Sequence, residues 1–273
     1  MNLVAHCSIV SVDAAAVSAM WGRCKGLVGA CLRGGGAPGL RLALCLFASA
    51  ALAQSYQPTA ELFTGFELSN NYASVYVGGT TALGKGLYEP GFRLRAVGSF
   101  GRYHYDGTLL TDGEYVPTSF DGQDAFLAAL AGYQSRKGPL TTKLFAGLEA
   151  EDQNISPHDP NNAVQGSEIG LWLATENWLD ISPKLFLSVD ASYGTAFQEY
   201  CALTRLGFRL RPRLALGLEG GALGNEEYNA GKGSGFVRIN LRDTEFTLSG
   251  GFTGNYLQDL PSGYISLGVY RTF

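Results

Sequence analysis

The final stretch of the sequence decides the fold: Gly263-Tyr264-Ile265-Ser266-Leu267-Gly268-Val269-Tyr270-Arg271-Thr272-Phe273. Ile265, Leu267 and Val269 share one face of this segment, and mainly small or polar residues share the other. Because successive side chains of an extended chain point to opposite faces, the alternation predicts a β-strand. This strand runs to an aromatic last residue, Phe273.

A last strand that ends on phenylalanine is typical of the closing strand of a bacterial outer-membrane barrel, where this residue helps the insertion machinery recognise its client. A soluble all-β domain can also end in Phe273, so the interpretation needs independent support. Arg271 departs from the usual barrel terminus, which carries an apolar or aromatic residue at this position. At the inner rim of a barrel its long side chain can reach water.

The amino-terminal segment indicates export. Basic residues precede the apolar run 42–53 (LALCLFASAALA), which ends in the small-x-small cleavage signature Ala51-Leu52-Ala53. The run is shorter than the roughly 20 apolar residues of a membrane-spanning helix. We therefore predict a signal peptide over residues 1–53, with Met20 as an alternative start, and a single barrel domain over residues 54–273.

Removal of the predicted signal peptide changes the charge balance. Residues 1–53 hold four of the 20 basic and one of the 24 acidic residues, which leaves 16 basic against 23 acidic residues. This acidic balance argues against a nucleic-acid partner. Cys201 is the only cysteine left, too few for a cysteine metal cluster. All 14 tyrosines and many of the 37 glycines lie beyond residue 53, a composition typical of a β protein with tight turns and aromatic belts.

Alternation with a period of two recurs about twelve times in the mature chain, and no helical stretch competes with it. Each run is long enough to cross a bilayer when tilted. The runs cover residues 59–69, 72–83, 91–105, 123–135, 140–151, 167–179, 184–194, 200–211, 213–222, 234–242, 244–254 and 263–273. They predict an all-β fold, an antiparallel up-and-down transmembrane β-barrel of about 12 strands.

The connections between the runs alternate between short and long. The short ones are rich in glycine and proline, as at 136–139 and 211–213, which supplies a turn mechanism. Longer polar connections are expected at 106–122, 152–166 and 223–233. Sorting of this kind is typical of a membrane barrel with short periplasmic turns and long outer loops.

Charged residues share one parity within the predicted strands, opposite the apolar parity. In a soluble protein the charged face would point to water, so the parity alone does not decide the orientation. A charge on the lipid face costs about 2 to 4 kcal/mol at mid-bilayer, so a membrane barrel must turn the charges inward. The predicted lumen-facing residues are Arg93, Arg95, Lys143, Glu149, Glu168, Glu176, Asp190, Arg205, Arg209 and Arg238.

Aromatic residues cluster near the ends of the predicted strands, where interfacial belts place their rings. Ordinary strand propensity accounts for the same cluster in another way. The belt candidates are Tyr72, Tyr103, Tyr105, Trp178, Tyr193, Tyr256, Tyr264, Tyr270 and Phe273.

Two short motifs resemble ligand loops but lack essential residues. Residues 79–86 have the glycine and lysine spacing of a phosphate-binding loop, yet Gly86 stands where Ser or Thr is required. Residues 152–156 begin like a calcium loop, yet Pro157 and Ala163 occupy the positions of its glycine and its bidentate acid. We therefore predict no cofactor, no metal and no catalytic residue.

His104 is the main candidate base for a membrane-facing hydrolase, because its parity turns it toward lipid headgroups. A belt position explains this histidine equally well, and no serine is close to it in sequence. The inward charges have two interpretations as well. They can line a selective aqueous path, or they can pair into a network that fills the lumen.

Several segments resemble the bacterial cellulose biosynthesis protein BcsS family. The opening stretches FTGFELSNNYASVYVGG (63–79) and GFRLRAVGSFGRYHYD (91–106) carry the resemblance, and FAGLE (145–149) and GFRLR (207–211) are similar too. The likeness spans most of the mature chain, but its motifs are those of strands and turns and name no catalytic site.

The resemblance implies a non-catalytic accessory in the bacterial outer membrane that supports cellulose production, export or surface attachment. Its expected partners are outer-membrane lipid and either cellulose or components of cellulose secretion. One alternative is a narrow channel for small solutes, as the inward charges suggest. A lipid-modifying enzyme that uses His104 is a third.

Overall fold

The computed structural model describes residues 57–84, 86–255 and 262–273, so the predicted signal peptide and Tyr256 lie outside the described residues. The strands are β1 (Ala60–Ser69), β2 (Tyr72–Leu83), β3 (Gly91–Thr111), β4 (Glu114–Lys137), β5 (Leu140–Ser156), β6 (Gly166–Asp180), β7 (Leu185–Gly194), β8 (Tyr200–Arg211), β9 (Leu214–Gly224), β10 (Asn229–Leu241), β11 (Thr244–Asn255) and β12 (Ser262–Thr272). A short 3₁₀ turn, η2 (Ala196–Gln198), precedes β8. No helix among the described residues is long and apolar enough to cross a membrane.

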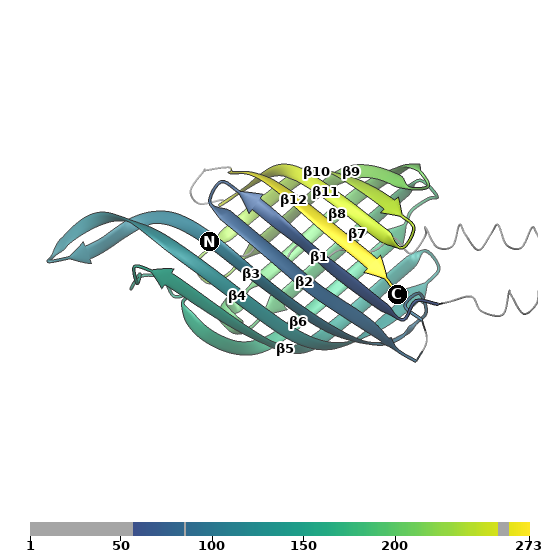
Figure 1. Ribbon diagram of the computed structural model, residues 1–273, viewed down its shortest axis with the longest axis horizontal. Helices are drawn as coiled ribbons and strands as arrows, with labels where there is room; N and C mark the ends of the chain where they lie inside the picture. Colours follow the sequence, from purple (N-terminus) through teal and green to yellow (C-terminus); the bar gives the residue numbers. More distant parts are fainter. Residues whose placement is uncertain (1–56, 85, 256–261) are drawn as a thin grey trace, which may run out of the picture.

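Each strand pairs antiparallel with its neighbours in sequence, and β1 also pairs with β12, which closes the sheet into a barrel (Figure 1). The β1–β12 register joins Phe63 to Tyr270 and Gly65 to Gly268. At the seam, the Thr59 and Ala60 amides donate to the carbonyl oxygen of Phe273. The predicted closing strand therefore closes the barrel, and the predicted twelve-stranded antiparallel fold is confirmed.

The outer wall of this barrel is apolar and its interior is charged. Ile169 and Leu218 point outward and are 82% and 70% exposed, whereas Arg93 and Arg238 point inward and are 1% exposed. A water-soluble protein has the opposite distribution, because burial of apolar surface drives its folding. The structure thus resolves the ambiguity of the parity in favour of a transmembrane barrel.

The two ends of the barrel differ, and we name them by their connections. The turn end carries the β2–β3, β4–β5, β6–β7, β8–β9 and β10–β11 connections together with the start of β1 and the end of β12. The opposite end, the loop end, carries the β5–β6, β7–β8 and β9–β10 loops. The longest described connection, between β5 and β6, lies at the loop end, as the sequence predicts. The sorting by length is incomplete, because the short β1–β2 connection at 70–71 lies at the loop end and the β2–β3 connection at 84–90 lies at the turn end.

The predicted polar loops are shorter in the structure than the sequence suggested, and one of them is a paired hairpin. The segment expected as a polar loop at 106–122 continues β3 and β4 as a paired hairpin that projects beyond the barrel at the loop end (Figure 1). We call residues 106–119 the β3–β4 arm. Asp112 and Gly113 turn the chain with φ of 53° and 86°, the left-handed pair of a two-residue hairpin turn. The polar composition suggested a loop, but cross-strand pairing satisfies the backbone.

Interior aromatic rings lie over glycines on the neighbouring strand. A Cβ on Gly122 would lie 1.8 Å from Cζ of Tyr103, its cross-strand partner, so only glycine lets this ring lie flat against the sheet. Similar pairs recur in the interior: Phe63 with Gly78, Tyr76 with Gly65, Phe145 with Gly132, Phe186 with Gly207 and Phe236 with Gly217. This pairing explains why the chain is rich in both residue types.

The extent of the membrane-facing wall can be tested with two matched substitutions. Leu148 lies midway along β5 on the outer wall, and Leu110 lies on the β3–β4 arm; both are exposed. We expect Leu148→Arg to lower folding stability in lipid vesicles by about 2 to 4 kcal/mol, because the charge enters hydrocarbon. Leu110→Arg should be tolerated. Urea titration of the refolded variants checks this, and equal losses at both sites would contradict the assignment.

Candidate functional site

All ten predicted lumen-facing residues lie on the inner parity of their strands. Seven of them are buried: Arg93, Arg95, Glu149, Glu176, Asp190, Arg205 and Arg238. Lys143 and Arg209 are partly buried, and Glu168 is exposed at the loop end, where its carboxylate accepts the Phe197 amide at 3.1 Å.

The central network joins four strands through two cations and two carboxylates. Arg95 on β3 contacts Glu176 on β6 through Nη1 and Glu61 on β1 at 3.5 Å through Nη2. Lys143 on β5 lies 3.0 Å from Glu176 and 3.7 Å from Glu61. The Tyr270 hydroxyl donates to Glu61 at 2.8 Å. Each carboxylate therefore faces two cations, which offsets the cost of removing these charges from water.

A second network lies on the β7–β12 side of the barrel. Arg205 donates through Nε to Glu219 Oε2 at 2.8 Å and lies 3.7 Å from Asp190. The hydroxyls of Ser234 and Tyr264 each donate to the other oxygen of Glu219 at 2.8 Å. Side chains from β8, β10 and β12 thus converge on this one carboxylate of β9, with Asp190 on β7 as a further neighbour of Arg205.

Aromatic rings surround the cations near the turn end. Trp178 and Phe186 stack with their ring centroids 4.4 Å apart, and the Arg238 guanidinium lies 5.3 Å and 5.2 Å from these two centroids. Arg238 is also 3.2 Å from Glu245. Arg209 pairs with Asp180 at 2.6 Å. These contacts combine ion pairing with cation–π attraction inside the barrel.

Besides the acidic side chains near the loop end described in the next paragraph, five buried charges were not among the predicted residues: Glu61, Glu67, Glu219, Lys232 and Glu245. Four of them occupy the inner parity of predicted strands, so a complete reading of that parity would have found them. Lys232 fell in the predicted loop 223–233, but β10 begins at Asn229. The Lys232 ammonium lies 2.5 Å from Glu67, a contact that closure of the barrel creates.

Acidic side chains gather in the interior near the loop end: Asp124, Glu149, Glu151 and Glu199 are all buried. Burial raises the pKa of Glu199 well above its usual value, and the nearby charges of Asp124 and Glu149 raise it further. A hydrogen bond with Glu151 lowers the pKa but does not cancel this rise. Glu149 approaches Gly170 and Gly194, where added Cβ atoms would lie 2.7 Å and 2.5 Å from its carboxylate oxygens. Its Oε1 accepts the Ala196 amide at 2.9 Å.

The loops of this end are joined by hydrogen bonds. The Tyr105 hydroxyl donates to Asp159 of the β5–β6 loop at 2.7 Å. The Ala163 amide of the same loop donates to Glu227 of the β9–β10 loop at 2.9 Å. Glu226 in turn donates its amide to the Phe197 carbonyl at 3.2 Å. These bonds connect β3 with three loops around the mouth.

The belt prediction is wrong for five residues. Tyr72, Tyr103, Trp178, Tyr264 and Tyr270 are buried on the inner parity, whereas a belt ring must point outward. Proximity to a strand end suggested a belt, but the parity sends these rings into the interior.

The other belt candidates are placed differently. Tyr105 is partly buried on the inner parity, while Tyr193 and Phe273 are exposed. Tyr256 lies outside the described residues. Outward rings that the prediction missed include Phe92 and Tyr133, which pack edge to face with centroids 5.2 Å apart.

The motifs set aside in the sequence lie on strands and turns. Residues 79–83 belong to β2, and Gly84 turns with φ of 99°. Asp152 lies on β5, where its carboxylate accepts the Ser167 hydroxyl at 2.5 Å. No group of three or more His, Cys, Asp or Glu residues with metal-binding geometry occurs within the described part of the chain.

His104 is exposed on the outward parity. The fold brings a serine near it, although none is close to it in the sequence. Ser119 lies opposite Asp106, next to the pair formed by His104 and Asp121. The Ser119 hydroxyl donates to Asp106 at 2.6 Å. A serine that acts as a nucleophile donates its hydroxyl hydrogen to the general base, which here would be His104. Because Ser119 donates to Asp106, this hydrogen bond is structural.

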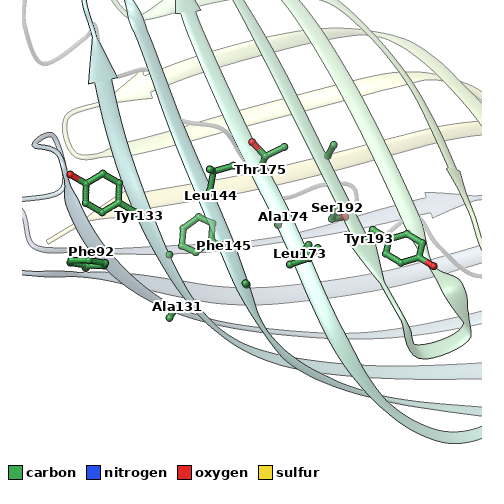
Figure 2. Close-up of a pocket in the computed structure, with 13 residues that line it drawn as sticks. Phe92, Ala131, Tyr133, Leu144, Phe145, Leu173, Ala174, Thr175, Ser192 and Tyr193 are labelled. Carbon is green, nitrogen blue, oxygen red and sulfur yellow. The ribbon is translucent and has the colours of Figure 1, made fainter.

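The outer wall carries an apolar groove of about 680 Å³ across β3 to β7 (Figure 2). Figure 2 shows Phe92 and Tyr133 at one end and Tyr193 at the other, with Leu144, Leu173 and Thr175 between them. Small residues lie among these larger side chains, including Ala131, Ala146 and Ala191. The groove faces away from the interior networks.

The central network can be tested by removing one charge. We expect Glu176→Gln to lower the free energy of unfolding by about 3 to 5 kcal/mol, because Arg95 and Lys143 then share one carboxylate. Urea unfolding of the detergent-solubilised barrel gives this value. Glu114→Gln on the exposed β3–β4 arm is the matched control and should leave the midpoint unchanged. Equal midpoints for the two variants would exclude a stabilising role.

Comparisons with solved structures show the fold. The TodX deltaS2S3 mutant monoaromatic hydrocarbon channel is similar with a TM-score of 0.51 at 7% identity, covering 82% of this chain and 92% of that one. LpxR from Salmonella typhimurium gives 0.48 at 11% identity, covering 78% and 100%. The outer membrane protein Omp33 of Acinetobacter baumannii gives 0.41 at 13% identity, covering 81% and 100%. At such identities the likeness concerns the fold alone.

A family comparison covers most of the described barrel. Residues 61–273 match the family described as cellulose biosynthesis protein BcsS, which includes all the segments that carried the resemblance in the sequence. No curated protein shows a significant match. Since the family match extends from the first residues of β1 to the end of the chain, this protein belongs to the cellulose biosynthesis protein BcsS family.

Proposed function

We propose that this barrel resides in the bacterial outer membrane and acts there as a non-catalytic accessory of cellulose biosynthesis, in export or surface attachment. The family match over residues 61–273 carries the link to cellulose. The apolar outer wall, with exposed side chains such as Leu148, Ile169 and Leu218, supports the membrane location.

The loop end supplies the surface for such a role. The β3–β4 arm projects beyond the barrel and exposes Leu110, Tyr115 and Val116 (Figure 1). The arm holds three acidic residues and no lysine or arginine. An exposed tyrosine beside hydrogen-bonding side chains suits contact with a neutral glucan, because a ring can stack while hydroxyls exchange hydrogen bonds.

The non-catalytic part of the proposal rests on the surroundings of His104. The Ser119 hydroxyl donates to Asp106 rather than to an imidazole. A lipid-modifying enzyme would need a serine or a water activated by the histidine. Full lipid hydrolysis by wild-type protein that is lost in His104→Ala would overturn this part.

A narrow channel for small solutes is the second candidate, favoured by the charged interior. Cations and carboxylates from β1, β3, β5 and β6 meet in the central network, and others surround Glu219. Charged rings of this kind select ions where water passes between them.

Deletion of the gene tests the accessory role. We expect the deletion strain to secrete less cellulose or to retain less of it at the cell surface, because an export or attachment component is missing. Dye binding and quantification of acid-insoluble glucan in cells and medium give the two values. Unchanged amount and attachment would contradict the role in cellulose production.

Complementation then locates the function on the barrel. A variant in which the β3–β4 arm is shortened to a two-residue Asn-Gly turn between Asp106 and Ser119 keeps the barrel pairing below it. Wild type should restore surface cellulose, and the shortened variant should reach the membrane without restoring it. Restoration by both would place the function away from the arm.

Conductance tests the channel. If ions pass through the lumen, Arg209→Ala should shift selectivity in planar bilayers toward cations, because a cation paired with Asp180 near the turn end is removed. Arg242→Ala, at an exposed turn, is the matched control and should leave selectivity unchanged. A silent bilayer, or identical selectivity in both variants, would exclude the channel.

A further inference from the structure

The groove on the outer wall runs across the strands rather than along them. Its two rows follow the hydrogen-bonding direction: Tyr133 pairs with Leu144, and Ala131 with Ala146. From β3 to β7 the groove crosses four strand intervals, about 19 Å at the usual strand spacing. A path of that length between side chains matches one extended hydrocarbon chain better than a compact ligand.

Small side chains form the floor and large ones the rim. Ala131 and Ala146 lie side by side on neighbouring strands, and the rings of Tyr133 and Tyr193 stand at the two ends (Figure 2). A hydrocarbon chain in the groove contacts protein on more than one side, whereas a chain on a flat wall contacts it on one. Dispersion attraction grows with the number of such contacts, so the groove holds a chain more strongly.

A cation lies on the same strand and the same face as one end of this groove. Lys137 shares the outward parity of β4 with Tyr133, four residues away, about 13 Å along the strand. It is exposed at the β4–β5 turn, opposite Leu140.

Lys137 belongs to a basic turn end. Exposed basic residues there are Arg136, Lys137, Lys184, Arg211, Arg213, Arg242 and Arg271, and the exposed described acids are Glu89 and Asp243. An anionic headgroup is therefore attracted to this end, whereas the loop end is rich in acidic residues.

We propose that the groove binds an acyl chain of an anionic phospholipid from the leaflet at the turn end, with the lipid phosphate at Lys137. Tyr133, at the rim, lies on the same face of β4 as Lys137 and brings a polar hydroxyl to the end of the groove, where it suits the ester groups of such a lipid. From the groove to Lys137 the protein presents an apolar floor, a polar rim and a cation. A phospholipid presents its acyl chain, its ester groups and its phosphate in the same order. This inference stands independently of the role in cellulose production.

Native mass spectrometry of the delipidated barrel in detergent tests the site, with phosphatidylglycerol and phosphatidylcholine of identical chains as probes. We expect the wild type to bind phosphatidylglycerol at least threefold more tightly. Ala146→Phe, which fills the floor, should weaken binding of both lipids at least fivefold. Lys137→Gln should abolish the preference for phosphatidylglycerol while retaining binding of phosphatidylcholine.

Matched controls separate a site from general coating by lipid. Ala202→Phe on the outward parity of β8 and Arg213→Gln at the β8–β9 turn lie outside the groove and should bind as wild type does. Equal affinities for Ala146→Phe and Ala202→Phe would overturn the proposal. So would a dimer that Ala146→Phe abolishes, because a second copy would then fill the groove. Displacement of lipid by inorganic phosphate alone would overturn the role of the acyl chain.

Discussion

Backbone pairing between β1 and β12 is the constraint on which the rest of the structure depends. Hydrocarbon offers no partner for an amide or carbonyl, so a sheet that faces it must close on itself. The Thr59 and Ala60 amides reach the carbonyl of Phe273 at the seam, and Gly65 faces Gly268 farther along it. Closure then gives every strand an inside and an outside, and the period of two assigns each side chain to one of them.

The interior that closure creates is held by two kinds of contact. Aromatic rings lie over cross-strand glycines, as Tyr103 does over Gly122, and this packs neighbouring strands. Ion pairs join strands that are far apart in sequence, as Lys232 and Glu67 do across 165 residues. The first kind depends on register alone, while the second requires the completed barrel. The charged interior is therefore a consequence of closure and also stabilises it.

The outer surface divides into zones that support different proposals. The wall is apolar, and the groove with small alanines on its floor has one end on the same face of β4 as Lys137, which belongs to the basic turn end. The β3–β4 arm and the acidic loops stand at the other end, where contact with a polysaccharide would occur. Separation of these zones along the barrel axis lets the membrane contacts and the proposed cellulose contacts vary independently.

The sequence by itself determined the class of fold, about twelve strands and which of the predicted charges share one face of a strand, because alternation with a period of two is a local property. It also placed the closing strand at Phe273. It failed where a local pattern has two outcomes: the polar segment 106–119 is paired sheet, and Tyr72 and Trp178 face inward although they lie near strand ends. Only the tertiary structure decided that Lys232 meets Glu67, since closure sets the distance between strands remote in sequence.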